Sequence, residues 1–275
     1  SQDSNIRNIA ADNNWLVKND YLNTPFVQSR NNNFQFRGSL QPLNSLRIQL
    51  DAKRIISENY QETFRYNSSE NSYVSLTPTR GGNFSLSFLS IKTAFIKDDE
   101  FNSSSVFESF VENRKIIRDR LSAVNSSGEY GLNSQDVLIP AFISAYSAQN
   151  PNNFSLNPFP KIPIPNWRID FSGLNKIKAI SELFSSITIS HSYQSMYSIG
   201  NFTNSLFYTD NLDFNNSIMN YPLATEISEN GLIPFYIINQ VRITERFAPL
   251  IGINVRTKNN LNARVDYKRD RNIML

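Results

Sequence analysis

Apolar and polar side chains alternate most regularly in residues 250–268. The apolar positions form two runs, which are Ile251, Ile253 and Val255 and then Leu261, Ala263, Val265 and Tyr267. The positions between them are mostly polar and include Asn254, Arg256, Asn262 and Arg264. Alternation with a period of two residues is typical of β-strands that have one apolar and one polar face. We therefore predict a β-hairpin in this part of the chain.

The two faces also predict the length of the hairpin loop. A loop of two residues would place Arg256 opposite Ala263 and mix the faces, whereas a three-residue loop at 258–260 keeps both faces uniform. The pairs that follow are Val255 with Ala263, Ile253 with Val265, Ile251 with Tyr267, Arg256 with Asn262 and Asn254 with Arg264. Asparagine tolerates the left-handed backbone that such a loop needs. We predict the three-residue loop.

Further strands are predicted upstream by the same alternation. Even-numbered positions form a long apolar face in 46–66, but Arg54, Glu58 and Glu62 interrupt it. We therefore expect the far end of this strand to project beyond a membrane. In residues 235–247 one face is formed by Ile237, Val241, Ile243 and Phe247.

Glycine, proline and asparagine indicate where these strands turn. We predict turns at residues 80–83, which include Gly81 and Gly82, and at Ala248 and Pro249. Apolar positions change from odd to even across Gly200 and Asn201. That change favours a two-residue hairpin loop at these positions.

Between residues 102 and 166 the pattern changes to that of helices. A helical stripe is formed by Phe107, Phe110, Val111, Ile117, Leu121 and Val124. Ser105 followed by Glu108 resembles a capping box at the start of this helix. A second, shorter helix is predicted from about Ser134, with Pro140 either limiting it or lying in its first turns.

A proline-rich segment follows these helices and leads into Trp167. Its prolines are Pro158, Pro160, Pro163 and Pro165. Proline at this density predicts an extended segment outside any strand ladder. We therefore divide the chain into barrel strands and loops at 1–101, a helical and proline-rich insertion at 102–166, and further barrel strands at 167–275. We expect the insertion to lie over a rim or in the lumen.

Composition narrows the classes of protein that fit. The chain has 275 residues, no cysteine and a formal net charge of +3. Without cysteine, disulfides and thiolate metal sites are excluded. The small, interspersed charge argues against nucleic acid as a partner. No apolar run approaches the ~18 residues of a membrane helix, whereas the alternating strands of a β-barrel give only weak hydropathy signals.

The remaining choice is between a soluble β-sandwich and a membrane β-barrel, because strands alternate in both. Predicted strands of about 10 residues or more favour the barrel. So do aromatic residues near strand ends and a polar face rich in Arg, Asn and Gln. We predict an all-β fold, namely a section of a transmembrane antiparallel β-barrel with a short helical and proline-rich insertion. The apolar residues of the 250–268 hairpin would then face lipid, and its polar residues would line the lumen.

The sequence offers little catalytic or metal-binding chemistry. His191 is the single histidine, and its place among apolar positions of a predicted strand favours packing over catalysis. The acidic run at 98–100 could contribute to a Ca²⁺ site, although a solvated strand end is the simpler interpretation. Gly81 and Gly82 lack the Lys and Ser or Thr that complete a phosphate-binding loop. We predict no enzymatic activity, no cofactor and no metal ion.

Three stretches resemble the C-terminal region of the SprA/Sov family, the very large outer-membrane translocons of the type 9 secretion system in Bacteroidota. They are NSQDVLIPAF at 133–142, LNPFPKIPIPNWR at 156–168 and FAPLIGI at 247–253. Residues 58–67 and 92–95 are also similar, and the proline-rich stretch is the most specific of these motifs. The resemblance extends through nearly the whole chain.

This resemblance implies a section of a giant barrel in the outer membrane that passes folded cargo proteins to the cell surface. The implied partners are membrane lipids, the remainder of the barrel, a PorV-like shuttle barrel, a periplasmic plug protein and secreted cargo. Because family members are several times longer, we expect this chain to be a piece that cannot close a barrel alone. The alternatives are another outer-membrane transporter or porin, and a soluble β-rich binding or adhesin domain.

Overall fold

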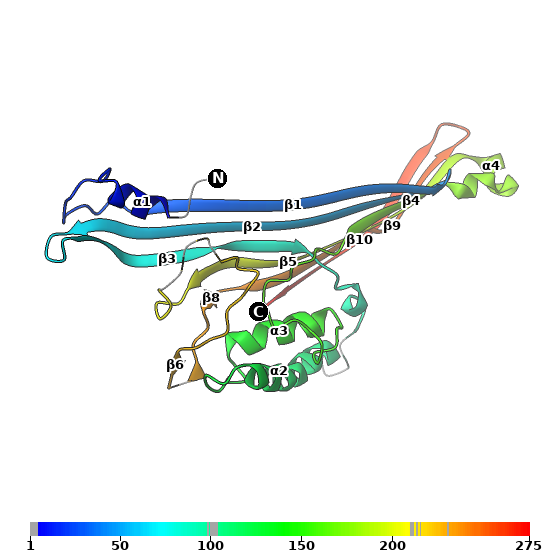
Figure 1. The fold of residues 1–275 in the computed structure, drawn as a ribbon. Coiled ribbons are helices and arrows are strands. Elements are labelled where there is room, and N and C mark those ends of the chain that lie inside the picture. Colours follow the sequence, from blue (N-terminus) through cyan, green and yellow to red (C-terminus); the bar gives the residue numbers. More distant parts are fainter. Residues whose placement is uncertain are drawn as a thin grey trace.

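The computed structural model describes residues 5–97, 99, 104–209, 212, 214, 216–229 and 231–275. Its main feature is one large sheet of long strands (Figure 1). The strands of this sheet are β1 (Phe26–Leu43), β2 (Leu46–Asn67), β3 (Ser72–Ser87), β4 (Asn166–Phe171), β5 (Phe184–Asn204), β8 (Tyr236–Ile238), β9 (Val241–Thr257) and β10 (Asn262–Met274). A small second sheet pairs β6 (Ile227–Ser228) with β7 (Gly231–Leu232).

The large sheet has the order β1-β2-β3-β5-β9-β10, and each adjacent pair is antiparallel. This confirms the prediction of a mostly β, antiparallel fold. β3 is shorter than its neighbours, and β4 takes its place between β2 and β5 beyond Ser87. β8 extends the sheet beside the last residues of β5. Within the described part of the chain, β1 and β10 form the two edges.

The predicted register of the 250–268 hairpin is confirmed. β9 and β10 pair Val255 with Ala263 and Ile253 with Val265, as the three-residue loop requires. The backbone N–H of Thr257 donates to the Leu261 carbonyl at 2.9 Å and closes the loop. Asn260 has φ +61°, so the left-handed residue of the loop is an asparagine.

The predicted turn at Gly200 and Asn201 is wrong, because β5 continues through both residues. Ile199 pairs with Phe84 and Phe202 with Gly82, so β5 carries one extra residue here relative to β3. One extra residue is a β-bulge, and it transfers the apolar positions from odd to even without a turn. On the other side of β5, the pairing strand is interrupted at residues 239–240, between β8 and β9. Tyr236 and Ile238 are therefore buried and Ile237 is exposed, which corrects the predicted face.

The predicted turn at Ala248 and Pro249 is also wrong, because β9 runs through it. Ser190 pairs with Gly252 and Tyr193 with Phe247, so β9 holds two extra residues at this point. Proline has no N–H to donate to a ladder and is found at such irregularities. Because two residues are inserted, the apolar face of β9 keeps its orientation beyond them.

The glycines at 81 and 82 do not form a turn either, since both lie inside β3. A Cβ on Gly81 would lie 2.6 Å from the backbone oxygen of Phe202, and one on Gly82 would collide with the backbone oxygen of Ser57. Glycine is therefore required by the close approach of the strands on both sides of β3.

Both predicted helices in the insertion are confirmed as α2 (Ser105–Val124) and α3 (Gln135–Tyr146). The cap of α2 lies one residue earlier than predicted, because Ser104 Oγ accepts the Phe107 N–H at 3.4 Å. Pro140 lies inside α3. The short helices are α1 (Ile6–Asp12), α4 (Lys178–Leu183), η1 (Ile91–Thr93) and η2 (Gly173–Lys176). Among the described residues, no helix is long and apolar enough to cross a membrane.

The proline-rich segment has no ladder of its own and lies against the sheet. Tyr197 Oη donates to the Pro158 carbonyl at 2.9 Å, and the Ile164 N–H donates to the Ser87 carbonyl at 3.0 Å. Phe159 is fully buried among Phe84, Phe202 and other rings. Pro158, Pro160, Pro163 and Pro165 thus belong to a strap across the sheet, and Trp167 begins the pairing of β4.

Candidate functional surface: a sheet with one polar and one apolar face

One face of the sheet is polar across all strands at the end near the β9–β10 loop. Strand register aligns the following residues in one row across β2, β4, β5, β9 and β10: Arg47, Asp170, Ser190, Gly252 and Asp266. Arg168 pairs with Asp170 at 3.0 Å and Arg264 pairs with Asp266 at 2.9 Å. The predicted lumen-facing residues Asn254, Arg256, Asn262 and Arg264 are all exposed on this face.

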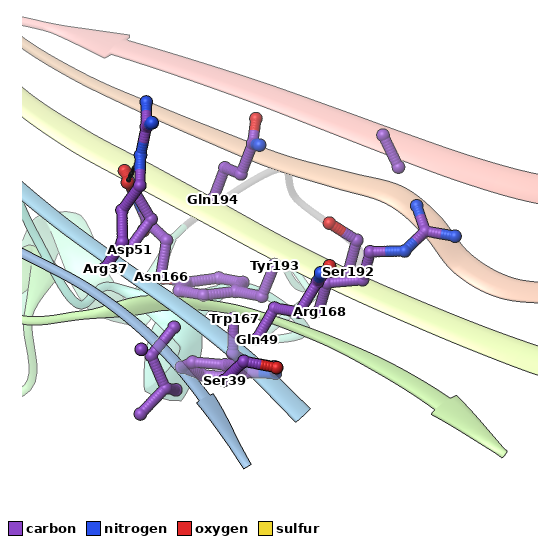
Figure 2. A pocket seen from close by; sticks show the side chains of 13 residues that line it. Arg37, Ser39, Gln49, Asp51, Asn166, Trp167, Arg168, Ser192, Tyr193 and Gln194 are labelled. Atoms are coloured by element: carbon purple, nitrogen blue, oxygen red, sulfur yellow. Dashed lines mark hydrogen bonds and ion pairs between the residues drawn. The ribbon is translucent and has the colours of Figure 1, made fainter. Parts of the chain in front are cut away.

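A shallow hollow of about 560 Å³ lies where β4 replaces β3 (Figure 2). Its wall includes the ion pair between Arg37 and Asp51, at 3.2 Å, together with Asn166 and Gln194. Asn166 Oδ1 accepts the Ser195 N–H at 2.8 Å. This side chain therefore satisfies a backbone N–H of β5 at the point between β3 and β4 where no strand pairs with it.

The opposite face carries apolar residues at the same end of the sheet, and we call them the open apolar band. They are Leu46, Ile48, Ile169, Phe171, Ile189, Ile251, Ile253, Val255, Ala263, Val265 and Tyr267. None belongs to the core formed with the helices. Ile251 is 55 % exposed and Val265 is 69 % exposed, whereas Ile187, which pairs with Val255 on the same face, is 8 % exposed. The predicted lipid-facing residues therefore share this face, with Leu261 exposed at the loop.

An aromatic cluster borders the open apolar band. Trp167 stacks on Tyr193 with ring centroids 4.5 Å apart, and Tyr193 lies 5.1 Å from Phe247. Phe95 continues the cluster at 5.2 Å from Phe247. His191 lies beside it, and its Nδ1 is 2.7 Å from the Leu250 carbonyl oxygen. The single histidine is thus packed at the border between two parts of the apolar face.

Beyond this border α2 and α3 cover the apolar face, and we call them the helical unit (Figure 1). Sheet residues such as Phe84, Tyr197 and Ile243 are fully buried against helix residues such as Ile117 and Phe142. Burial of an apolar side chain of this size contributes about 1.5–3 kcal/mol. The same face of the sheet is therefore open at one end and covered at the other.

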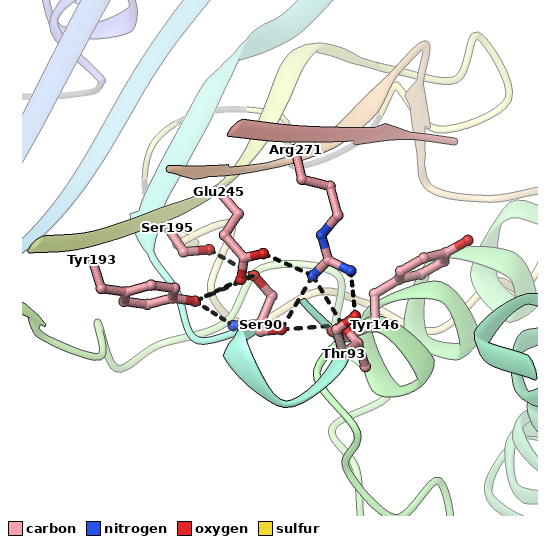
Figure 3. A network of polar contacts seen from close by, with 7 residues as sticks. All are labelled: Ser90, Thr93, Tyr146, Tyr193, Ser195, Glu245 and Arg271. Atoms are coloured by element: carbon pink, nitrogen blue, oxygen red, sulfur yellow. Dashed lines mark hydrogen bonds and ion pairs between the residues drawn. The ribbon is translucent and has the colours of Figure 1, made fainter. Parts of the chain in front are cut away.

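A buried polar network holds the covered part to the sheet (Figure 3). Glu245 Oε1 accepts from Ser90 Oγ at 2.7 Å and from Tyr193 Oη at 3.0 Å. Its other oxygen lies 3.1 Å from Arg271 of the edge strand β10. Arg271 also donates to the Thr93 carbonyl at 2.8 Å, and Thr93 Oγ1 donates to the carbonyl at the end of α3. The sheet, the segment after β3 that contains Ser90 and Thr93, and the helical unit thus meet at the buried Glu245 carboxylate.

A second buried carboxyl, Asp136, lies in the first turn of α3. Tyr221 Oη donates to its Oδ1 at 2.7 Å. Burial raises the pKa of Asp136 to about 6, although the hydrogen bond from Tyr221 opposes this shift. Burial and the nearby Asp136 also raise the pKa of Tyr221.

Two acidic residues occupy the far end of the apolar face on β2. Glu58 pairs with Arg30 at 2.7 Å and also with Arg80. Glu62 pairs with Arg7 and accepts from Tyr60 Oη at 2.8 Å. The two acidic residues that interrupted the alternation are therefore buried and paired, whereas Arg54 is half-buried and donates to the Lys161 carbonyl at 2.6 Å.

Glu245 and Asp136 were not identified from the sequence. Glu245 lies on the parity of Ile243 and Phe247, so an acidic residue inside an apolar run was the available signal. Asp136 carried no comparable signal. In the described part of the chain, no group of three His, Asp or Glu side chains is arranged to hold a metal ion. Asp98 and Glu100 of the acidic run lie outside the described residues.

Comparison with known proteins adds no relative. No model of a known protein family matches the chain, and no curated protein matches its sequence. The resemblance to the SprA/Sov family therefore stays a prediction from the sequence.

Proposed function

We propose that this chain forms a section of an outer-membrane β-barrel wall, with the open apolar band against lipid and the polar face against a water-filled lumen. The observation that carries the proposal is the opposite polarity of the two faces over β2, β4, β5, β9 and β10. A soluble protein rarely leaves a contiguous apolar band of this kind uncovered. In a barrel wall, lipid covers it.

The height of the band supports this proposal. Residues 184–193 of β5 run from the loop end to the aromatic cluster, and their nine steps rise about 30 Å at ~3.3 Å per residue. With a strand tilt of ~40° they would span about 23 Å, close to the apolar height of ~25 Å in outer-membrane barrels. Trp167 and the half-exposed Phe95 of the aromatic cluster would then lie at one membrane interface, where aromatic girdles occur.

Connection lengths support an orientation. At the end of the open band, β1 joins β2 and β9 joins β10 by short turns, while residues 172–183 with η2 and α4 join β4 to β5. At the other end, a short turn joins β2 to β3, whereas the two longest connections of the sheet join β3 to β4 and β5 to β8. Outer-membrane barrels have short turns in the periplasm and longer loops outside. We therefore assign the helical unit to the outer side. Because it shares a face with the open band, the rim fits it better than the lumen.

The edges β1 and β10 require further strands, since unpaired backbone groups are not tolerated in lipid. We propose that these strands come from the rest of a large protein-conducting barrel, as the SprA/Sov resemblance implies. The chain would contribute wall and rim to a pore for folded cargo, with a shuttle barrel and a periplasmic plug as partners.

Because the chain has no cysteine, single-cysteine labelling tests the assignment of faces directly. Ile253→Cys and Val265→Cys should resist a water-soluble maleimide in native membranes and should be accessible to a lipid-soluble one. Asn254→Cys and Arg264→Cys, their neighbours on the polar face, should react with the water-soluble reagent. Equal and rapid labelling of all four variants by that reagent would exclude a lipid-facing band and favour a soluble β-rich domain.

A further inference from the structure

The end of the sheet far from the open apolar band holds a fully buried carboxylate paired with a partly buried guanidinium. The Glu62 side chain has 0 % exposure, and its carboxylate pairs with the guanidinium of Arg7. Tyr60 Oη donates to Glu62 at 2.8 Å, and Ser75 Oγ donates to the same oxygen. A carboxylate removed from water in this way needs a cationic partner, because a buried charge without one is strongly destabilising.

Three aromatic rings surround the same guanidinium. The Arg7 Cζ atom lies 5.6 Å from the ring centre of Phe26, 5.3 Å from that of Tyr60 and 6.0 Å from that of Phe64. Ring faces within about 6 Å attract a cation, and a planar guanidinium also stacks on them. We call Phe26, Tyr60, Phe64 and Glu62 the arginine cage. Its chemistry selects a planar cation.

The residue in the cage belongs to a weakly attached segment. Arg7 lies in α1, which has 7 residues and none that are buried. The rest of the segment is joined to the sheet at exposed or half-buried positions, for example by Tyr73 Oη to the Leu16 carbonyl at 2.8 Å and by the Ser68 N–H to Asp20 at 2.7 Å. A helix this short has little stability of its own. Of these contacts, that of Arg7 alone reaches a fully buried side chain, Glu62, so we take Arg7 as the main anchor of the segment.

The cage opens onto a hollow of about 860 Å³. Arg7 and Tyr60 line the hollow together with residues 75–79 of β3. Three residues from the segment after β5 complete its lining, namely Leu206, Thr209 and Leu212. The rim is irregular, because β3 shifts register against β2 here and Thr77 has φ +50°. A β-branched residue in the left-handed region is an outlier, and such strained residues occur most often at functional sites.

We propose that the arginine cage and this hollow form a binding site for an extended, arginine-bearing segment of a partner protein, and that Arg7 occupies the cage as an exchangeable latch. The partner's arginine would enter the cage while its backbone lay along the hollow. The latch competes at the effective concentration of a tethered group, in the millimolar range. A partner must therefore use the hollow as well as the cage to displace it.

The test empties the cage with Arg7→Ala in the full chain and titrates it with N-acetyl-arginine amide by isothermal calorimetry. This variant should bind the probe at least ten times more tightly than the original chain, and at least ten times more tightly than it binds N-acetyl-lysine amide. Adding Glu62→Gln or Phe64→Leu should each weaken binding at least tenfold. Circular dichroism establishes which variants remain folded, and Phe64→Leu serves if Glu62→Gln does not.

Hydrogen exchange tests the latch separately. Amides of residues 8–15 should exchange at least ten times faster in Arg7→Ala, whereas Arg118→Ala, which removes a surface arginine on α2, should not change them. Two results would overturn the proposal. One is a folded Arg7→Ala chain that does not bind the arginine probe. The other is binding that Phe64→Leu and Glu62→Gln leave intact.

Discussion

The covered and open regions of the apolar face share a strand. In β9, Ile243 is 0 % exposed beneath the helical unit, while Ile253 is 41 % exposed in the open apolar band. Both side chains belong to the same alternation and lie on the same face. The difference is what covers them. The helical unit covers Ile243, whereas Ile253 lies outside the core that the described helices form with the sheet.

This comparison separates two pieces of information that alternation is often taken to give together. Alternation reports which side chains share a face, because the period of a strand is two. It does not report whether the apolar face meets helices, lipid or another sheet. Here the buried polar network around Glu245 lies at the boundary between the covered region and the open apolar band.

The largest effect is expected on the covered side, from Glu245→Ala. Removing one member of a buried ion pair costs about 3–5 kcal/mol, because Arg271 would lose its partner while still packed against Thr93. Urea unfolding of the variant should show this loss. The matched change Glu182→Ala, on exposed α4, should lower the free energy of unfolding by less than ~0.5 kcal/mol. Similar values for the two variants would contradict a structural role for the network.

On the open side, Ile253→Arg should lower the free energy of unfolding from phospholipid vesicles by about 2–4 kcal/mol. This is the cost of placing a cation on the lipid face near the middle of the bilayer. The control is Asn254→Arg, the adjacent residue on the polar face, which should change stability by less than ~0.5 kcal/mol. If the two substitutions had equally small effects, the open apolar band would face water, and the proposed lipid contact would be wrong.

A third prediction concerns pH and the covered side. Because the pKa of Asp136 is raised from 3.8 to about 6, the folded chain holds this proton more tightly than the unfolded chain. Stability should therefore fall as pH rises from about 4 to about 6 and should then level off, by at most about 3 kcal/mol. Asp136→Asn should remove this slope, whereas Asp119→Asn, at the surface of α2, should preserve it. An unchanged slope in Asp136→Asn would refute the assignment.

How much of this could be predicted from the sequence depended on local signals. The register of the 250–268 hairpin was predictable, because a two-residue loop would place Arg256 opposite Ala263 and only the three-residue loop keeps both faces uniform. The helices of the insertion were predictable from their apolar stripe. The turns at Gly81, Gly200 and Pro249 were wrong for a common reason. Glycine and proline fit bulges and close strand contacts as well as turns, and only the neighbouring strands distinguish these cases.

The candidate site was less predictable than the fold. The two sets of residues in the hairpin could be assigned to opposite faces, because parity is a local property. The covering of that face by the helical unit depends on contacts between β3, β5, β9 and α3, which are distant in sequence. The arginine cage joins Arg7 to Glu62 across a similar distance. No spacing rule relates such residues.

The smallest expected effect tests the loop that holds the open band in register. Asn260 has φ +61°, a conformation that costs an L-residue with a branched side chain about 1–2 kcal/mol. Asn260→Val should therefore lower the free energy of unfolding by about 1 kcal/mol, and Asn260→Gly should leave it equal or slightly higher. Asn259→Val, next in the same loop, is the control and should be nearly neutral. If both valine variants behaved alike, the left-handed residue would not determine this register. The uniform faces of the strands would then be sufficient to hold Ile253 opposite Val265.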